Sequence, residues 1–337
     1  MRPMRFAILG IAMLALVVVT ASGQPIISAK SGVIAGLEGK VFLDNQALES
    51  SVTHFSDMKE NSVLRTEDGR AEVLLPPGYV LRIGENASFK MLTNRLIDTR
   101  VEMMTGSGIV VVDENSKDTN VAVALKAGAA TLSRTGVYRF DSEPARIKVF
   151  SGTASVLLGE STILVPTGHM LSLAGGAAMV EKFDAGDTDA LDHWARRRGE
   201  AMAVANVSAA KYVNDNYGKL NHSSWGFNPY FGLYTYIPMS GRMCNPYYDY
   251  CYYSPGMVYN TFYAPAVSYN SGFGQRNGFN PGHSTMGRTS TGVSSTVAAA
   301  PSRGSSPTMG SASRASSAAA SSSAGHGSAS SGGGHAK

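Results

Sequence analysis

Residues that could do chemistry are few and widely spaced in this sequence. The seven histidines stand at positions 54, 169, 193, 222, 283, 326 and 335, and no two lie within four residues of each other. A zinc hydrolase motif on one helix needs two histidines four residues apart, so the sequence does not indicate that class of enzyme. His169 falls in a predicted hairpin turn, where we expect a structural or exposed role. Asp113 and Glu114 lie in a predicted polar loop, and we expect both to be solvated.

Motifs for a nucleophile or for phosphate binding are also missing from the sequence. It contains no Gly-x-Ser-x-Gly elbow, and Gly106-Ser107-Gly108 is interpreted as a turn between strands. No glycine-rich loop followed by lysine comes after a predicted strand. We therefore expect no enzymatic activity, no cofactor and no metal site.

Cys244 and Cys251 are the only cysteines, with six residues between them. In an oxidising compartment such a pair can close a small loop, which typically stabilises a protein by roughly 2–4 kcal/mol. Two free thiols and half of a metal site are the alternatives. A metal would need two further ligands nearby, and the nearest histidine, His222, is isolated. We favour the disulfide.

Aromatic residues are concentrated late in the chain, since 12 of the 15 tyrosines fall between Tyr217 and Tyr269. At this density they could stack on sugars or on peptide surfaces. The candidate binding surface consists of Trp225, Tyr230, Tyr234 and Tyr236. The same side chains could instead pack on one another or dock on the preceding part of the chain, and we favour this second interpretation.

Charge is unevenly distributed along the 337 residues. Only 16% of them are charged, and the formal net charge of +4 arises from the end of the chain, because no Asp or Glu follows Asp249. Up to Asp249 the chain has 24 basic and 25 acidic residues. A nucleic-acid-binding protein needs a clustered basic surface, so we expect no nucleic-acid partner.

Residues 1–23 have the layout of a secretory signal peptide. Arg2 and Arg5 precede an apolar run from Phe6 to Val19, and small residues follow it. We favour cleavage of this segment over its retention as an uncleaved membrane anchor. We expect the chain to contact a membrane only if the segment is not cleaved. In both cases the rest of the chain lies outside the cytoplasm, in the periplasm or at the cell surface. No cysteine follows the apolar run, so lipid attachment there is not expected.

Residues 24–185 are predicted to form an all-β domain, either a β-sandwich or a short β-solenoid. Short runs rich in β-branched residues recur about every ten residues, with turn residues between them. The clearest runs are Gly39–Leu43, Ala71–Leu75, Tyr79–Ile83, Gly108–Val112, Val121–Leu125, Arg146–Phe150, Thr153–Leu158 and Thr162–Val165. Asp68-Gly69 is a strong hairpin signal, because the favoured turn needs positive φ at both central residues.

Three further segments follow this domain. Residues 186–212 are predicted to be a helix with acids at its start, and we expect the arginines at positions 196, 197 and 198 to lie on its solvated face. Residues 213–269 form the aromatic segment. Residues 270–337 are predicted to be a disordered tail, since 28 of the final 37 residues are Ser, Gly or Ala.

The β region resembles the FecR domain, an extracytoplasmic module of bacterial regulators. The resemblance begins with Val73-Leu74-Leu75-Pro76-Pro77-Gly78-Tyr79-Val80-Leu81-Arg82-Ile83, with Asn86 and Ser88 beyond. It continues in Gly136–Phe140, Ile147–Phe150, Gly152–Val156 and Pro166–Met170, and covers roughly 145 residues. The segment Asp192-His193-Trp194, its arginines and the aromatic segment are similar to an extension found in envelope FecR-like proteins of soil bacteria such as acidobacteria.

This resemblance implies a scaffold rather than a reaction. Family members that hold a sigma factor do so with a cytoplasmic domain before the membrane segment, and only five residues precede the apolar run here. We therefore expect a non-catalytic, extracytoplasmic FecR-like protein that binds or scaffolds an envelope protein. Two alternatives remain: a polysaccharide-binding or adhesive protein that uses the aromatic segment, and a sensor subunit that acts with a separate anti-sigma partner.

Overall fold

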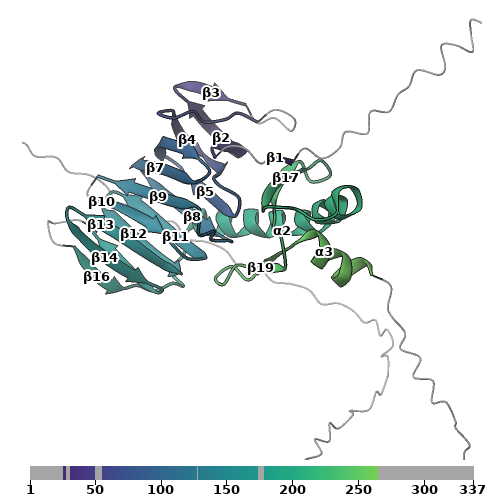
Figure 1. The fold of residues 1–337 in the computed structure, drawn as a ribbon. Coiled ribbons are helices and arrows are strands. Elements are labelled where there is room, and N and C mark those ends of the chain that lie inside the picture. Colours follow the sequence, from purple (N-terminus) through teal and green to yellow (C-terminus); the bar gives the residue numbers. More distant parts are fainter. Residues whose placement is uncertain (1–25, 28–30, 50–54, 127, 174–177, 265–337) are drawn as a thin grey trace, which may run out of the picture. The chain divides into compact units, whose positions relative to one another are not determined.

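The computed structural model describes residues 26–27, 31–49, 55–126, 128–173 and 178–264 (Figure 1). The predicted signal peptide and the predicted tail lie outside these residues. Strand β1 (Ile26–Ile27) lies outside the sheet of the β domain. The strands of the β domain are β2 (Val33–Leu43), β3 (Gln46–Leu48), β4 (Val63–Leu74), β5 (Tyr79–Ile83), β6 (Ser88–Arg95), β7 (Asp98–Thr105), β8 (Ser107–Val112), β9 (Asn120–Leu125), β10 (Gly128–Leu132), β11 (Gly136–Ser142), β12 (Ala145–Ser151), β13 (Thr153–Leu158), β14 (Ser161–Pro166), β15 (His169–Ser172) and β16 (Met179–Lys182). The later elements are α2 (Ala190–Tyr217), β17 (Ser224–Asn228), β18 (Leu233–Ile237), β19 (Arg242–Cys244), β20 (Cys251–Tyr253), α3 (Pro255–Val258) and a π-helical turn, η1 (Tyr259–Tyr263).

The predicted all-β body is confirmed. Strands β2 to β16 form one sheet of 15 strands, in which the main path runs β14-β13-β10-β9-β7-β6-β4-β5-β8-β11-β12-β15-β16. All pairings along this path are antiparallel except that of β7 with β9. Its two end strands are therefore β14 and β16.

Alternation along the strands builds the core of the sheet. In β9, for example, Val121, Val123 and Leu125 are buried and the residues between them are half-buried. Inward side chains from strands along the path, from Val165 of β14 to Leu171 of β15, meet in one hydrophobic core. The sheet is therefore folded so that two parts of it pack face to face. Its inner face forms the hydrophobic core, and its outer face consists of two halves, one on each part.

Helix α2 covers one half of the outer face. The helix begins at Ala190 because Asp189 caps it: the Asp189 side chain accepts hydrogen bonds from the backbone N–H groups of Leu191 and Asp192, and the Asp192 carboxylate accepts one from the Asp189 N–H. Its buried face includes Leu191, Trp194 and Met202. The predicted helix, residues 186–212, thus begins and ends four to five residues too early.

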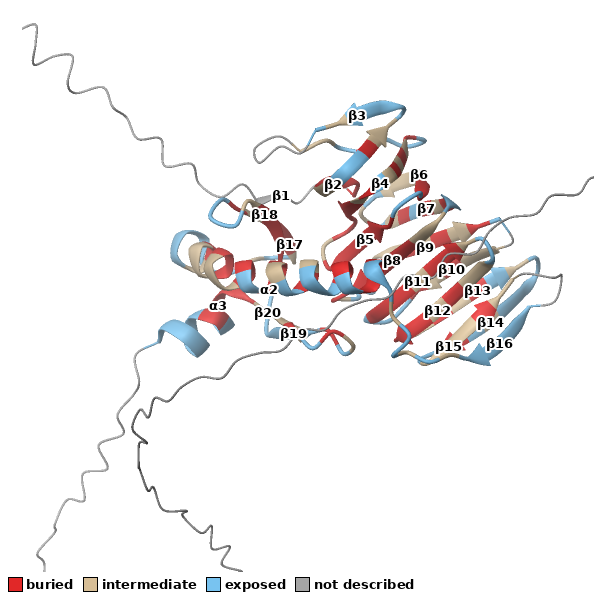
Figure 2. Ribbon diagram, turned by 180° about the vertical axis from the view of Figure 1, so that it is seen from behind, coloured by how far each residue is buried: buried red, intermediate tan, exposed pale blue. Residues whose placement is uncertain are grey.

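The aromatic segment packs beside α2 on the same half of the sheet. Trp225 of β17, Tyr236 of β18 and Tyr252 of β20 share a second hydrophobic core with outward side chains of the sheet such as Val80 and Ile109. Strand β5 is consequently buried on both faces, whereas β16 at the end of the sheet is exposed throughout (Figure 2). The interpretation that the aromatic residues dock on the β region is confirmed.

Asp68-Gly69 does not form a hairpin turn, and that prediction is wrong. Both residues lie inside β4, where Gly69 is paired with Gly39 of β2. A Cβ atom on Gly39 would collide with the backbone of Asp68. The two strands can approach each other closely there because neither Gly39 nor Gly69 has a side chain. Gly69 thus serves the close pairing of β2 and β4 rather than a turn.

No helix in the part of the chain that the structure describes is long and apolar enough to cross a membrane. Contacts within the chain place the described residues in one compact unit.

Candidate functional site: an uncharged, uncovered sheet face

The other half of the outer face belongs to strands β9, β10, β13 and β14. These four strands are neighbours in the sheet, and none of their residues carries a charge. Apart from Asn120 at the start of β9, their outward side chains are small, hydroxylated or aliphatic. They are Ala122, Ala124, Ala129, Thr131, Thr153, Ser155, Leu157, Thr162, Leu164 and Pro166. We call this set the uncharged face.

The register of the strands places these residues side by side. Leu164 lies beside Ser155, which lies beside Thr131, which lies beside Ala122. The next strand along, β7, ends the uncharged face because Arg100 stands next to Ala122. The surface therefore changes from charged to uncharged at the boundary between β7 and β9.

Two leucines on this face are unusually accessible. Leu157 retains 51% and Leu164 64% of its accessible surface. On the other half of the sheet, outward side chains such as Val80, Ile109 and Val111 are buried under α2 and the aromatic segment. An apolar sheet face normally requires a covering layer, and no described element covers this one.

Strand β14 also leaves one edge of the sheet open. Within the described part of the chain it pairs only with β13. The other end strand, β16, carries Glu181 and Lys182, the type of residue that protects an edge from unwanted pairing. From Ser161 to Val165, β14 has no such residue, and only Pro166 at its end lacks an N–H.

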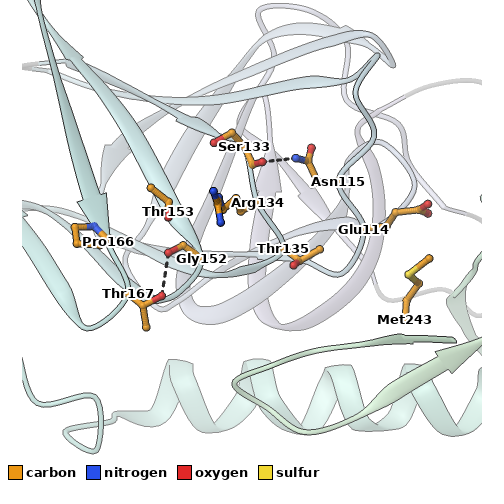
Figure 3. A pocket seen from close by; sticks show the side chains of 10 residues that line it. All are labelled: Glu114, Asn115, Ser133, Arg134, Thr135, Gly152, Thr153, Pro166, Thr167 and Met243. Atoms are coloured by element: carbon orange, nitrogen blue, oxygen red, sulfur yellow. Dashed lines mark hydrogen bonds between the residues drawn. The ribbon is translucent and has the colours of Figure 1, made fainter.

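A polar groove of about 770 Å³ lies at the end of the uncharged face (Figure 3). Its wall continues the face, since Thr153 and Pro166 of that face line it. The remaining lining residues are Glu114, Asn115, Ser133, Arg134, Thr135, Gly152, Thr167 and Met243.

Hydrogen bonds hold the walls of this groove in place. The Thr167 hydroxyl donates to the Gly152 carbonyl (2.9 Å), and the Tyr138 hydroxyl donates to the Arg134 carbonyl (2.7 Å). Asn115 donates to the Ser133 carbonyl. Arg134 is the only cation that lines the groove, and its side chain has no ion pair within the described residues. The groove can therefore accept polar groups, including an anion near Arg134.

A buried ionic cluster lies on the covered half of the sheet, beneath α2. Glu72 accepts hydrogen bonds from Arg82 of β5 (2.8 Å) and from Arg198 of α2 (2.5 Å). Burial alone would raise the pKa of Glu72, but the attraction of the two arginines outweighs it and lowers the pKa to about 2. The expectation that Arg198 lies on a solvated face is wrong, because its helix turns it toward the sheet. Arg196 does lie on the exposed face, where it pairs with Glu200.

Asp113 and Glu114 are also placed differently from the prediction. Asp113 is 2% exposed and accepts a hydrogen bond from Asn245 (3.0 Å). Burial raises the pKa of Asp113 to about 6, although the Asn245 hydrogen bond opposes the shift. Glu114 accepts hydrogen bonds from the hydroxyls of Ser223 and Tyr236. Both acids anchor the C-terminal segment to the sheet; Asp113 is buried, and Glu114 is half-buried at the groove.

The four aromatic residues of the candidate binding surface do not form one surface. Trp225 is 2% exposed and donates its indole N–H to the Leu75 carbonyl (2.9 Å). Tyr234 and Tyr236 are buried as well, and only Tyr230, at 89% exposure, faces solvent. The hypothesis of a shared aromatic surface is therefore corrected, because the segment uses these rings to cover the sheet.

Cys244 and Cys251 are joined by a disulfide in the structure. They are directly opposed residues of β19 and β20, so the bond closes that hairpin. Among the described residues, no group of three or more His, Cys, Asp or Glu side chains could hold a metal ion.

No protein-family model and no curated protein matches the chain. Two crystal structures of a predicted anti-sigma factor from Parabacteroides distasonis ATCC 8503 are similar to it, both at 16% sequence identity. The similarity covers 40% and 41% of this chain and 64% of the other chain, with TM-scores of 0.34 and 0.33. The chain thus matches less than two thirds of the length of these solved structures.

Proposed function

We propose that the chain is a non-catalytic, exported FecR-like protein that binds a protein partner in the cell envelope through the uncharged face. The observation that carries this proposal is a four-strand surface without a charged residue that no described element covers. Burying such a surface gains roughly 25 cal/mol per Å² of apolar area and places no unpaired charge in a dry interface. Export and envelope location rest on the leader sequence, and the FecR relationship rests on the residues given above.

The structure does not favour the polysaccharide-binding alternative. Three of its four candidate residues, Trp225, Tyr234 and Tyr236, are buried, although Tyr230, Phe231 and Phe262 remain exposed. A sensor subunit with a separate anti-sigma partner is a narrower form of the proposed function. A sigma-factor gene beside the gene for this chain would support that narrower form.

Site-specific photo-crosslinking in the producing cells tests the proposed function. A photoreactive residue in place of Thr131 lies at the middle of the uncharged face, and one in place of Val204, which is 60% exposed on α2, is the control. We expect a crosslinked protein partner from the first position and not from the second.

Thr131→Arg is the variant that we expect to lose binding of the protein partner. The arginine points outward, so the fold is retained, but a charge now stands in the docking surface and the partner is lost. Crosslinks of equal yield from Thr131 and Val204, or a partner that still binds the Thr131→Arg chain, would contradict the proposal.

A further inference from the structure

We propose that the open edge of β14 pairs with β14 of a second copy of this chain, which makes an antiparallel dimer. The inference concerns self-association and does not rest on the envelope partner. Strand β14 presents five residues with a free edge, Ser161 to Val165, before Pro166 ends the row of N–H donors. In an antiparallel ladder the backbone groups of successive residues point to opposite sides, so Thr162 and Leu164 direct their N–H and C=O groups to the open edge. These groups form a template for one more strand.

The strand that best fits this edge is β14 itself. Antiparallel pairing of two identical strands about a two-fold axis is self-complementary, because each contact occurs twice. Ile163 is the middle residue of the free stretch, so an axis there pairs Ile163 with its own copy. Leu164 then lies opposite Thr162 of the other copy, and Ser161 opposite Val165.

Packing supports this register. Ile163 is half-buried at the rim of the core, and Leu164 is 64% exposed on the uncharged face. In the dimer the two Ile163 side chains meet at the open end of the two cores. Leu164 gains Thr162 of the other copy as its neighbour across the new pair.

Charge is compatible with the dimer as well. No like charges face each other along the paired strands, since β14 has no charged residue. The nearest charge, Glu160, falls opposite Pro166 of the other copy. Pro166 borders the groove that Arg134 and Glu114 both line, so Glu160 meets no net charge of its own sign there.

The dimer would join the two uncharged faces into one. Eight adjacent strands at about 4.8 Å spacing make a continuous surface roughly 38 Å wide. Five paired residues a side bury less than the roughly 1,200 Å² typical of stable interfaces, so we expect dissociation constants in the micromolar range.

Sedimentation of the purified full chain over about 1 to 500 µM tests the inference, because this range spans the expected dissociation constant. We expect the mass to rise from monomer to dimer with concentration. Thr162→Lys with Leu164→Lys puts like charges across the pair and should leave a monomer throughout. Leu157→Lys is the matched control, since it adds a lysine to the same face one strand away from the edge and should leave the dimer intact.

A charge-swapped partner tests the register. The Thr162→Glu, Leu164→Glu chain should also be monomeric alone, and mixing it with the double-lysine chain should restore a heterodimer. Far-UV circular dichroism establishes that each variant is folded. A wild-type chain that stays monomeric, a double-lysine chain that still dimerises, a Leu157→Lys chain that does not, or a mixture without heterodimer would each overturn the proposal.

Discussion

At the scale of single residues, Glu72 ties two distant parts of the chain together. It shares its carboxylate between Arg82, ten residues away, and Arg198, 126 residues away on α2. Both Glu72 and Arg82 are 1% exposed, so neither charge is compensated by water. A buried pair of this kind gives little net stability compared with apolar packing, but the loss of one partner leaves an uncompensated charge.

Replacing Glu72 therefore has a large effect. We expect Glu72→Gln to lower the free energy of unfolding by about 3 to 5 kcal/mol at neutral pH. The pKa of Glu72 is lowered in the folded state, so its contribution is present above its ordinary pKa of 4.5 and is lost as the pH falls toward about 2. Denaturant titrations at several pH values should show that the free energy of unfolding of the variant falls less steeply at acid pH than that of the wild-type chain. Glu67→Gln, which removes an exposed pair with Arg65 on the same strand, should cost no more than about 1 kcal/mol.

Asp113 has the opposite pH dependence. Its folded-state pKa is raised from 3.8 to about 6, so the folded state binds its proton more tightly than the unfolded state does. The contribution of Asp113 to stability thus falls as the pH rises from about 4 to about 6, by at most about 3 kcal/mol. Asp113→Asn should remove this decline, whereas Asp118→Asn in the same loop should keep it. If the free energy of unfolding of Asp113→Asn still declined with pH in this range as it does in the wild-type chain, another group would be responsible for the decline.

Gly199 allows α2 to lie close to the aromatic segment. A methyl group there would collide with the ring of Tyr250. Gly→Ala in a helix ordinarily gains about 1 kcal/mol, but overpacking costs about 1 to 3 kcal/mol, so we expect a net loss of stability. The denaturation midpoint should fall in Gly199→Ala, and a Tyr250→Ala background should reduce or reverse the effect. A higher midpoint for Gly199→Ala alone would contradict this packing.

At the scale of elements, the β19–β20 hairpin depends on its disulfide. The hairpin carries Asn245, Tyr248 and Tyr250 onto the sheet, and its two strands are only three residues long. Cys244→Ser with Cys251→Ser should lower the free energy of unfolding by about 2 to 3 kcal/mol. Thermal unfolding with and without a reducing agent measures this. The reductant should destabilise the wild-type chain and leave the double variant unchanged.

Local patterns were sufficient to predict individual strands but not their partners. The runs Tyr79–Ile83 and Thr153–Leu158 coincide with β5 and β13, because alternation and β-branched residues are properties of the segment itself. The burial of Asp113 depends on Asn245, 132 residues later, and no local pattern contains that distance. The Asp68-Gly69 prediction failed for the same reason, since Gly39 of another strand determines what the glycine does.

The sequence contains the four uncharged runs that form the candidate site, but only the strand order shows that they are neighbours. Residues 120–125, 128–132, 153–158 and 161–166 contain no charged residue. In the sequence these runs are separate, and charged residues lie between them. The strand order β14-β13-β10-β9 brings the four runs together into one surface.

At the scale of the whole compact unit, the β region depends on the segments that follow it. The outer face of the sheet has two apolar halves, and α2 with the aromatic segment covers the one formed by residues such as Leu74, Val80 and Ile109. A chain that stops at residue 185 loses this cover and exposes Arg82 and Glu72 without Arg198. The β region alone therefore presents an apolar surface far larger than a soluble monomer usually has.

A truncated chain ending at residue 185 should consequently bind more of a hydrophobic dye such as anilinonaphthalene sulfonate, and aggregate more, than a chain ending at Ala264. Light scattering and dye fluorescence on the two chains at equal concentration make the comparison. The uncharged face is present in both, so a difference between them reports only the covered half of the sheet. If the shorter chain were monomeric and bound no more dye than the longer one, the β domain would be stable without the second core, and this prediction would be wrong.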